Sequence, residues 1–336
     1  MKIVVLAGGL SDERDVSLSS GSQIANALMS KKHQVLLVDL IEGTPEFTTF
    51  DEAYKELKKE EYSYVIPETA PDLDKIKADY KLTSEIGENI IPLCQSADMV
   101  FLALHGGIGE NGKLQALFDI YNINYTGSSH KGSALAMDKL LAKELMAFHG
   151  INTPKWQIYE EGIIPNLPCV VKPNNNGSSI GIAIVDTITE FNVAIEAAKR
   201  FKTDILLEEK VSGREFAVGV LGSETLPIIE IIPKIGFYDY KNKYQAGSAE
   251  EVTPADISLN LTEEMQSMAL KTHHILGLSG YSRIDFMMNQ KNEIFCIEAN
   301  TLPGMTPTSL LPQEAKASGL DYDDLCEKLI EVSKKK

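Results

Sequence analysis

Two apolar runs near the start of the chain, separated by one helical stretch, constrain the fold more than any other feature. KIVVLAGG (2–9) predicts a buried strand that runs into a glycine turn, SLSSGSQIANALMS (17–30) predicts a helix, and HQVLLVDL (33–40) predicts the next strand. Strand, helix and strand in this order favour a parallel α/β sheet. DMVFLALHGGIGENG (98–112) repeats the strand and glycine-loop pattern, and INYTG (123–127) predicts a short last strand of the same unit.

The second half of the chain changes pattern. SALAMDKLLAKELMAFHG (133–150) predicts one helix that opens at Ser133 and stops at Gly150. LPCVVKPNNNGSSIGIAIV (167–185) predicts two strands joined by an Asn/Gly/Ser loop, which is typical of a hairpin and not of a βαβ crossover. Further helices are expected at about 189–201, at about 262–276 and at the C-terminal end. At 336 residues the chain has room for two or three domains.

Composition excludes some classes of partner. The net charge of −16 and pI of about 4.9 argue against nonspecific binding to nucleic acid or anionic membranes. Four widely spaced cysteines without a CxxC pair predict reduced, buried thiols of a cytoplasmic protein. The first apolar run is too short for a signal-peptide core, and no stretch approaches the ~18 apolar residues that cross a bilayer.

Two neighbouring segments near the C-terminal end carry closely spaced polar side chains. RIDFMM (283–288) and IEANTLPGMTPTS (297–309) each place two of them at i and i+2, on one face of a strand. If the strands pair as a hairpin, Arg283, Asp285, Glu298 and Asn300 converge. Two carboxylates and an amide oxygen suit Mg²⁺, and an adjacent Arg suits a transferring phosphoryl group. A surface salt bridge beside a Pro-Gly turn is the alternative.

Two basic residues point to phosphate binding, one of them just before the Asn/Gly/Ser loop of 167–185, which is called the glycine-rich loop below. In VVKPNNNGSSIG (170–181), Lys172 ends a strand, and the following loop offers backbone N–H groups and hydroxyls. The spacing is not that of a Walker A motif, and a flexible hairpin tip is the alternative. Lys139 in AMDKLLAKE is a second candidate, with a solvated helix lysine as its alternative.

Two further loops follow the strands of the first unit, where ligands of open α/β sheets bind. HGGIGENG (105–112) offers His105 to a substrate carboxylate, although a lone histidine is more often structural. GGLSDERDVS (8–17) offers Glu13 to an ammonium group, with a surface acid as the alternative. The double glycine and Asp39 suggest a dinucleotide site, but the third glycine of GxGxxG is missing.

Taken together, these segments resemble the D-alanine–D-alanine ligase family of the ATP-grasp superfamily over nearly the whole chain, most weakly at about 41–95. The motifs, in order, are GGLSDERDVSLSSG, LALHGGIGENGKLQ, YTGSSHKGSALAMDK, VVKPNNNGSSIG, EEKVSGREFAVGVLG, FYDYKNKY, RIDF and EANTLPGMTPTSLLP. The resemblance implies a three-domain α/β ATP-grasp architecture: a parallel-sheet, Rossmann-like substrate domain at 1–128, a central subdomain at 129–212, and a C-terminal subdomain at 213–336 with the metal and catalytic residues.

The resemblance also implies an activity and its residues. ATP would phosphorylate the carboxylate of one D-alanine, and the amine of a second would attack the acylphosphate. The implied ATP-binding residues are Lys139, Lys172, Glu208, Glu209, Val211 and Glu215, and the implied ligands of two Mg²⁺ (or Mn²⁺) ions are Asp285, Glu298 and Asn300. Arg283 and Gly304 would stabilise the transferring phosphoryl group. The implied residues for the two D-alanines are Glu13 and His105 for the first, and Lys243, Ser309 and Leu310 for the second. Glu13, Ser178 and Tyr244 would close the loop 234–250 over the site.

Alternatives remain at this stage. D-lactate or D-serine can replace the second D-alanine within the family, and Tyr244 beside Lys243 resembles the D-alanine users. HKGS (130–133) and Glu209 depart from the usual family pattern at positions without a catalytic role. The other two classes are a noncatalytic nucleotide sensor, disfavoured by the intact polar set at 283–300, and an NAD-dependent enzyme, disfavoured by the incomplete fingerprint. A homodimer is usual for the family.

Overall fold

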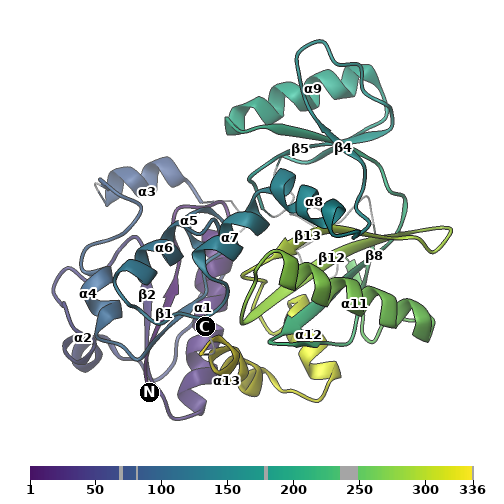
Figure 1. The fold of residues 1–336 in the computed structure, drawn as a ribbon. Coiled ribbons are helices and arrows are strands. Elements are labelled where there is room, and N and C mark those ends of the chain that lie inside the picture. The colour runs from purple at the N-terminus through teal and green to yellow at the C-terminus, as the bar shows by residue number, and fades with distance from the viewer. Residues whose placement is uncertain (68–70, 81, 178–180, 235–248, 335–336) are drawn as a thin grey trace.

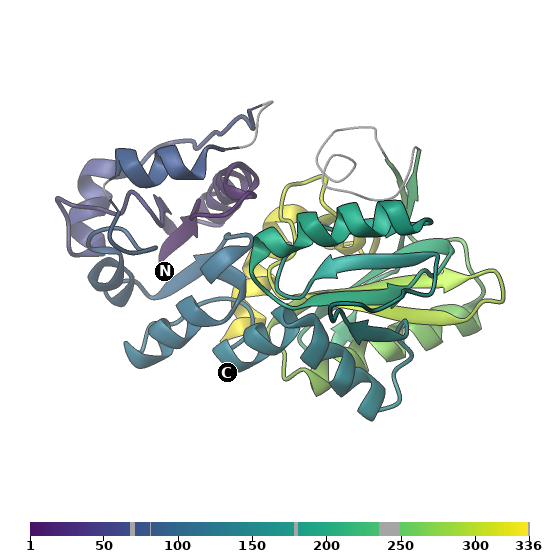
Figure 2. The same cartoon turned by 90° about the horizontal axis from the view of Figure 1, so that it is seen from above.

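The computed structural model describes residues 1–67, 71–80, 82–177, 181–234 and 249–334. They form one parallel and two antiparallel sheets. Figures 1 and 2 show the parallel sheet on one side of the molecule and the antiparallel sheets on the other. The mixed α/β fold expected from the sequence is confirmed.

The N-terminal unit is built around the predicted strand, helix and strand. The first sheet has the order β2-β1-β3, all parallel, and its strands are β1 (Lys2–Ala7), β2 (Gln34–Asp39) and β3 (Met99–Leu102). Helix α1 (Arg14–Ser30) packs against β1 and β2 and begins three residues before the predicted start. The expected last strand at 123–127 is reduced to one parallel bridge between Val100 and Tyr125. The other helices of this unit are α2 (Phe50–Leu57), α3 (Leu73–Asp79), α4 (Ile90–Gln95), α5 (Gly107–Glu110) and α6 (Lys113–Ile120).

The prediction of a single helix at 133–150 is wrong, because the helix is interrupted at Asp138. Helix α7 (His130–Met137) ends there, and α8 (Lys139–Phe148) begins one residue later. The Asp138 backbone is extended at ψ 99°, and its carboxylate accepts the backbone N–H of Leu141 at 3.0 Å, which caps α8. Ser133 lies inside the first turn of α7 and not at its start. The break places Lys139 in the first turn of a new helix.

The central unit is a small antiparallel sheet with the order β4-β7-β5-β6. Its hairpin of β5 and β6 confirms the strand pair predicted at 167–185. Helix α9 (Ile188–Ala198) covers the sheet, with Phe191 and Ile195 packed against Val171. The strands are β4 (Trp156–Ile158), β5 (Cys169–Pro173), β6 (Ala183–Val185) and β7 (Ile205–Glu209), and a 3-10 turn, η1 (Lys199–Phe201), follows α9.

The largest sheet has the order β11-β10-β8-β12-β13, with β9 beside β8. Helix α11 (Leu259–Ile275) covers one face, where Phe216 and Val218 of β8 meet Met265. Helix α12 (Leu310–Ala317) covers the opposite face. The strands are β8 (Gly213–Leu221), β9 (Glu224–Thr225), β10 (Ile229–Pro233), β11 (Ala249–Val252), β12 (Tyr281–Asn289) and β13 (Ile294–Asn300).

The last helix returns to the N-terminal unit. Helix α13 (Tyr322–Ser333) lies beside α1 and buries Leu325 and Leu329 in the core of the first sheet (Figure 1). A hydrogen bond of 2.6 Å joins His33 Nε2 to Glu327 Oε2. The first and last segments of the chain therefore share one core.

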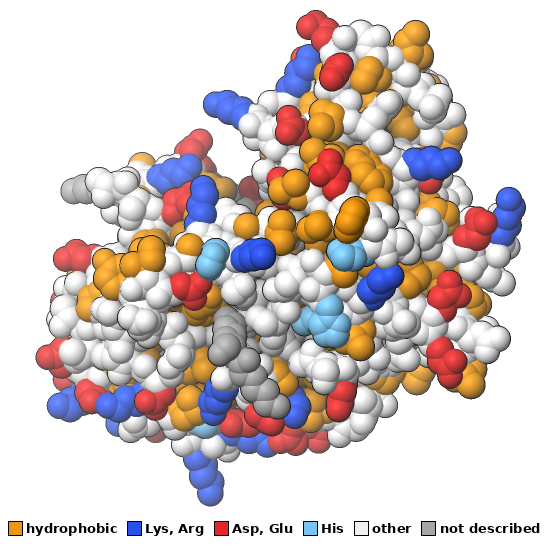
Figure 3. All heavy atoms as spheres, viewed as in Figure 1, with side chains coloured by type: hydrophobic (Ala, Val, Ile, Leu, Met, Phe, Trp, Pro, Cys, Tyr) orange, Lys and Arg blue, Asp and Glu red, His pale blue; other side chains and the backbone are white. Residues whose placement is uncertain are grey.

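Two expectations about the whole chain bear on its environment. All four cysteines are free and buried, as predicted. Within the described residues, none of the helices combines the length and apolar character needed to cross a membrane. Acidic and basic side chains are interspersed on the face shown in Figure 3, which carries no extended basic surface.

A buried histidine makes the stability of the largest unit sensitive to acid. His273 of α11 is 2% exposed, and its Nδ1 lies 2.8 Å from Ser282 Oγ. Burial, aided by His274, lowers the pKa of His273 to about 4, whereas the unfolded chain has the ordinary value near 6.5. As pH falls from 6.5 to 4, His273 is protonated in the unfolded state but stays neutral in the folded state, so the free energy of unfolding falls.

We expect His273→Asn to reduce the acid-dependent loss of unfolding free energy, which for His273 is at most about 3 kcal/mol. Urea unfolding at pH 7, 5.5 and 4.5 measures the change, and His149→Asn, at an exposed position, is the matched control. An unchanged pH dependence in His273→Asn would contradict the assignment.

Candidate functional site

The polar set at 283–300 converges as the sequence predicts. Strands β12 and β13 pair antiparallel, with Arg283 opposite Asn300 and Asp285 opposite Glu298. Arg283 donates from Nε to Asp285 Oδ1 at 2.7 Å and from a terminal nitrogen to Oδ2 at 2.8 Å. Asn300 Nδ2 donates to Asp285 Oδ2 at 2.9 Å. Arg283 and Asp285 are only 12% and 13% exposed, so the surface salt bridge considered as the alternative is wrong.

The donor set at this hairpin fits magnesium bound together with phosphate. Among the described residues, no three His, Cys, Asp or Glu side chains gather closely enough to hold a metal ion on their own. The hairpin instead offers two carboxylates and one amide oxygen. Mg²⁺ commonly takes one or two carboxylates and completes its shell with water and substrate phosphates. Asp285, Glu298 and Asn300 therefore match a metal that arrives with a nucleotide.

Lys139 reaches the same hairpin from α8. Its Nζ lies 3.5 Å from Glu298 Oε2 and donates to the backbone oxygen of Asn176 at 2.6 Å. Its side chain is 7% exposed, so the solvated-lysine alternative is wrong. The break at Asp138 explains this position, because Asn174 Nδ2 donates to Asp138 Oδ1 at 2.9 Å and joins the helix start to the glycine-rich loop.

Lys172 lies in a buried cluster that sequence reasoning found only in part. Glu208 Oε1 is 2.6 Å from Lys172 Nζ and 3.2 Å from Lys143 Nζ, in ionic contacts and not aligned hydrogen bonds. Lys143 is fully buried and also donates to Thr153 Oγ1 at 2.6 Å. Burial lowers the pKa of Lys143 to about 8, and the charge of Lys172 acts in the same direction. The available signal was spacing: Lys143 is four residues after Lys139 and on the same helix face.

The remaining nucleotide candidates lie next to this cluster. Glu209 is exposed, its Oε1 accepts the N–H of Lys155 at 2.9 Å, and its own N–H donates to the Lys155 carbonyl at 2.9 Å. Val211 lies between β7 and β8, and Glu215 lies on β8 opposite Met287 of β12. The fold therefore brings these positions to the boundary between the central and C-terminal sheets.

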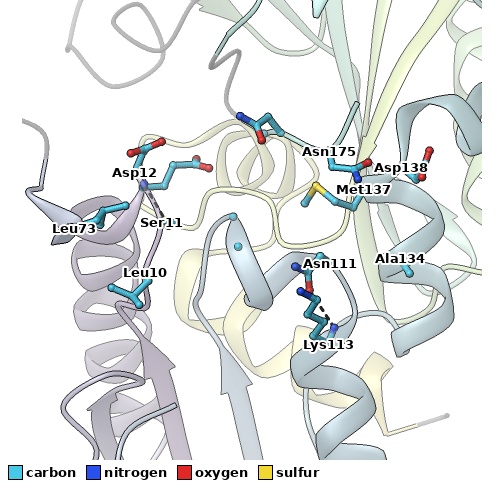
Figure 4. Close-up of a pocket in the computed structure, with 15 residues that line it drawn as sticks. Leu10, Ser11, Asp12, Leu73, Asn111, Lys113, Ala134, Met137, Asp138 and Asn175 are labelled. Carbon is cyan, nitrogen blue, oxygen red and sulfur yellow. Dashed lines mark hydrogen bonds between the residues drawn. The ribbon is translucent and has the colours of Figure 1, made fainter. Parts of the chain in front are cut away.

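A cavity of about 440 Å³ separates the N-terminal and central units. Figure 4 shows Leu10, Ser11 and Asp12 on one wall, with Met137, Asp138 and Asn175 on the other. In the space-filling view a notch separates the lobe with α3 from the lobe with α9 (Figure 3). Glu13 lines the cavity and is 6% exposed. The alternative of a surface acid for Glu13 is therefore wrong.

Glu110, which precedes the cavity-lining Asn111, is a further acid that sequence reasoning did not single out. Its Oε2 accepts the backbone N–H of Gly106 at 2.8 Å. Burial raises the pKa of Glu110, and the neighbouring Glu13 raises it further. A Cβ at Gly177 would lie 3.5 Å from a Glu13 oxygen and 3.9 Å from a Glu110 oxygen, so the start of the glycine-rich loop approaches both acids.

His105 is held by the protein on both sides of its ring. Nδ1 lies 3.2 Å from the Leu302 carbonyl and Nε2 lies 3.4 Å from Ser20 Oγ. Burial lowers its pKa, so the ring is neutral at physiological pH. His105 therefore links the first unit to the loop after β13, which supports the structural alternative.

The loop after β13 is built around a close approach. A Cβ at Gly304 would lie 2.9 Å from Ser309 Oγ, so a side chain at this position would displace the Ser309 hydroxyl group. Ser309 Oγ accepts the N–H of Thr306 at 3.1 Å, and Ser309 is the N-cap residue of α12. Leu310 follows and is buried. Three predicted site residues, Ser178, Lys243 and Tyr244, lie outside the described residues.

The dinucleotide alternative fails at Asp39. Arg14 donates to Asp39 Oδ1 at 3.1 Å and to the Gly9 carbonyl at 3.0 Å, and both ion-paired side chains are 8% exposed. A Cβ at Gly8 would lie 2.5 Å from Asp39 Oδ1. The carboxylate that would bind a ribose therefore serves an internal ion pair.

The comparisons with known proteins agree with this geometry. Family models described as D-ala D-ala ligase N-terminus and C-terminus match residues 2–128 and 148–331. A D-alanine–D-alanine ligase of Pediococcus pentosaceus is 44% identical over 342 residues, covering 98% of this chain and 97% of the relative. One of Lacticaseibacillus casei is 43% identical, covering 97% and 93%.

Solved structures give the same result. The D-alanine–D-alanine ligase of Bacillus anthracis complexed with ATP superposes with a TM-score of 0.74 at 26% identity, covering 100% of this chain and 98% of that one. The enzyme of Coxiella burnetii also gives 0.74 at 26% identity, covering 98% and 93%. The architecture is that of an ATP-grasp ligase. The chain belongs to the D-alanine–D-alanine ligase family.

The buried cluster around Glu208 yields a stability prediction. We expect Glu208→Gln to lower the free energy of unfolding by about 3 kcal/mol, because two buried ammonium groups lose the carboxylate that both of them contact. Denaturant unfolding without nucleotide measures this loss. The matched control is Glu209→Gln, at the neighbouring exposed position, which should change stability by less than about 1 kcal/mol. Equal stability of the two variants would contradict the cluster's role.

Proposed function

We propose that the protein joins two D-alanines into D-alanyl-D-alanine through a D-alanyl phosphate intermediate, as a step of peptidoglycan precursor synthesis. The observation that carries the proposal is the β12–β13 hairpin, where Arg283, Asp285, Glu298 and Asn300 converge with Lys139 of α8. A set of this kind suits phosphoryl transfer, because positive charge and metal ligands meet at one point.

In this proposal ATP lies between the central and C-terminal sheets. Lys139 and Lys172 bind its phosphates, and both already contact carboxylates at the site. Glu208, Glu209 and Val211 border the adenine, and Glu215 binds the ribose. The domain boundaries of 1–128, 129–212 and 213–336 remain part of the proposal, with α13 packed on the first unit despite its place in the last range.

Asp285, Glu298 and Asn300 would hold two Mg²⁺ (or Mn²⁺) ions in this proposal. When bound, these ions neutralise phosphate charge and stabilise the charge that develops on the transferring phosphoryl group. Arg283 donates to the same group, and its fork is oriented beforehand by Asp285. The backbone near Gly304 donates to the oxyanion of the tetrahedral intermediate.

The proposal gives each amino acid its own residues and brings the amine of the second next to the acyl carbon of the first, from which phosphate leaves. Glu13 holds the ammonium of the first D-alanine, and His105 lies near its carboxylate. Lys243, Ser309 and Leu310 hold the second. Glu13, Ser178 and Tyr244 link the loop 234–250 over the site, which excludes water from an acylphosphate that water would hydrolyse.

The reaction is tested by phosphate release from Mg-ATP with D-alanine alone, or with D-lactate or D-serine beside D-alanine, and by mass analysis of the products. We expect release with D-alanine alone and a D-alanyl-D-alanine product. Release that needs a second acceptor would change the substrate, and the absence of release in every mixture would overturn the reaction.

A variant tests the hairpin. We expect Asp285→Asn to lower kcat by at least about 100-fold, because it removes a metal ligand and the anchor of Arg283. Asp51→Asn, at an exposed position of α2, is the control and should keep kcat within about twofold. ATP turnover unchanged in Asp285→Asn would contradict the metal role.

A homodimer and a cytoplasmic location complete the proposal. The four free, buried cysteines suit a reducing compartment. Light scattering of the purified protein tests the oligomeric state, with twice the chain mass of 36.9 kDa expected.

A further inference from the structure

We infer that Glu314 is a positioning residue for the second, acceptor amino acid: its buried carboxyl group ties α12 to the β8 backbone directly opposite Arg283. The inference rests on the proposed function, which places the acceptor at Ser309 and Leu310. Glu314 belongs to none of the motifs and has no role in the proposal so far.

The first observation is a hydrogen-bond donor that the sheet leaves without a strand partner. The ladder between β8 and β10 ends with the pair Ala217 and Ile229. Two residues further along β8, the Gly219 N–H donates to Glu314 Oε1 at 2.8 Å, and the Gly219 carbonyl accepts the N–H of Leu226 at 2.8 Å. The carboxyl group of a helix residue thus supplies the acceptor that β10 no longer provides.

The second observation is the space that Gly219 leaves for α12. A Cβ there would lie 2.5 Å from Leu311 Cδ1 and 3.1 Å from Glu314 Oε2. Gly219 is also the residue of β8 that pairs with Arg283 of β12. Opposite residues of paired strands share a face, so Glu314 lies on the side of the sheet to which Arg283 points.

The third observation is the position of Glu314 within α12. It follows Leu310 by four residues, which places the two side chains on one face of the helix. Ser309 is the N-cap residue of the same helix, and its Oγ accepts the N–H of Thr306. A helix fixed to β8 at Glu314 therefore fixes the distance between Ser309, Leu310 and Arg283.

The buried carboxyl group of Glu314 lowers the stability of the fold through its desolvation, so its presence calls for another role. Glu314 is 0% exposed, and within the described part of the chain its Oε2 has no hydrogen-bond partner. Burial raises its pKa to about 8, Asp285 acts in the same direction, and the Gly219 N–H and Arg283 oppose the shift. The group is therefore mainly neutral at pH 7. An apolar side chain would fill this space without a desolvation cost, whereas it would leave the Gly219 N–H unpaired.

The test compares Glu314→Gln with Glu314→Leu and Glu314→Met. Gln keeps a neutral side chain with an accepting oxygen, and should keep the acceptor KM within twofold of the wild type. Leu and Met fill the space without an acceptor, and should raise the KM for the second D-alanine at least tenfold while the KM for ATP stays within threefold. Two apolar variants are used because one of them can fail to fold.

Two readouts separate this role from a loss of structure. Positional exchange of ¹⁸O in ATP requires only the first D-alanine, and should persist in Glu314→Leu and Glu314→Met. Both apolar variants should unfold in a cooperative melting transition, which shows that they are folded. An acceptor KM unchanged in the folded apolar variants would overturn the inference, and so would equal losses for ATP and for both D-alanines.

Ser309→Ala separates this inference from the proposed function. A raised acceptor KM in Ser309→Ala together with normal values in the apolar Glu314 variants would overturn the role of Glu314 alone. A normal acceptor KM in Ser309→Ala would overturn the proposed acceptor site.

Discussion

The structure depends on the neutralisation of buried charge before any ligand arrives. Asp285 is paired with Arg283, Glu298 with Lys139, and Glu208 with Lys172 and Lys143. Each pair joins a carboxylate to a cation, and every partner is largely buried. An unpaired ion in a low-dielectric interior costs folding free energy, so the carboxylates of the site stabilise its buried cations. In the proposed complex, ATP phosphates take the place of the acids as partners of the cations, and metal ions take the place of the cations as partners of the acids. No charge is then left unpaired.

The sheets determine where these pairs form. Strand β12 is paired on both sides, with β13 supplying Glu298 and Asn300, and with β8 supplying a glycine opposite Arg283. One face of this sheet packs on α11 and is apolar, while the other carries the polar set and receives α12. The alternation of side chains along a strand thus separates the stabilising face from the functional one.

Much of this arrangement could be read from the sequence, because its signals are local. The strand, helix and strand at 2–40 and the i, i+2 spacing of Arg283 and Asp285 both predict what the structure contains. The break at Asp138 was missed because the apolar pattern continues across it and only the capping carboxylate interrupts the helix. Lys143 and Glu314 were missed for another reason. Spacing places Lys143 on the helix face of Lys139 but does not show that it is buried, and Glu314 looks like an ordinary helix residue. The carboxylate that Lys143 contacts and the N–H that Glu314 accepts lie 65 and 95 residues away in the sequence.

The return of α13 to the N-terminal unit has a consequence for how the chain is made. Ribosomes release the N-terminal strands first, yet Leu325 and Leu329 enter the core of that first sheet only after the last helix has been synthesised. The central and C-terminal sheets have already emerged by then, and each can bury its own hydrophobic cluster. The unit that is translated first is therefore the last to be completed, and its unfinished apolar surface is what a nascent chain of this protein exposes for longest.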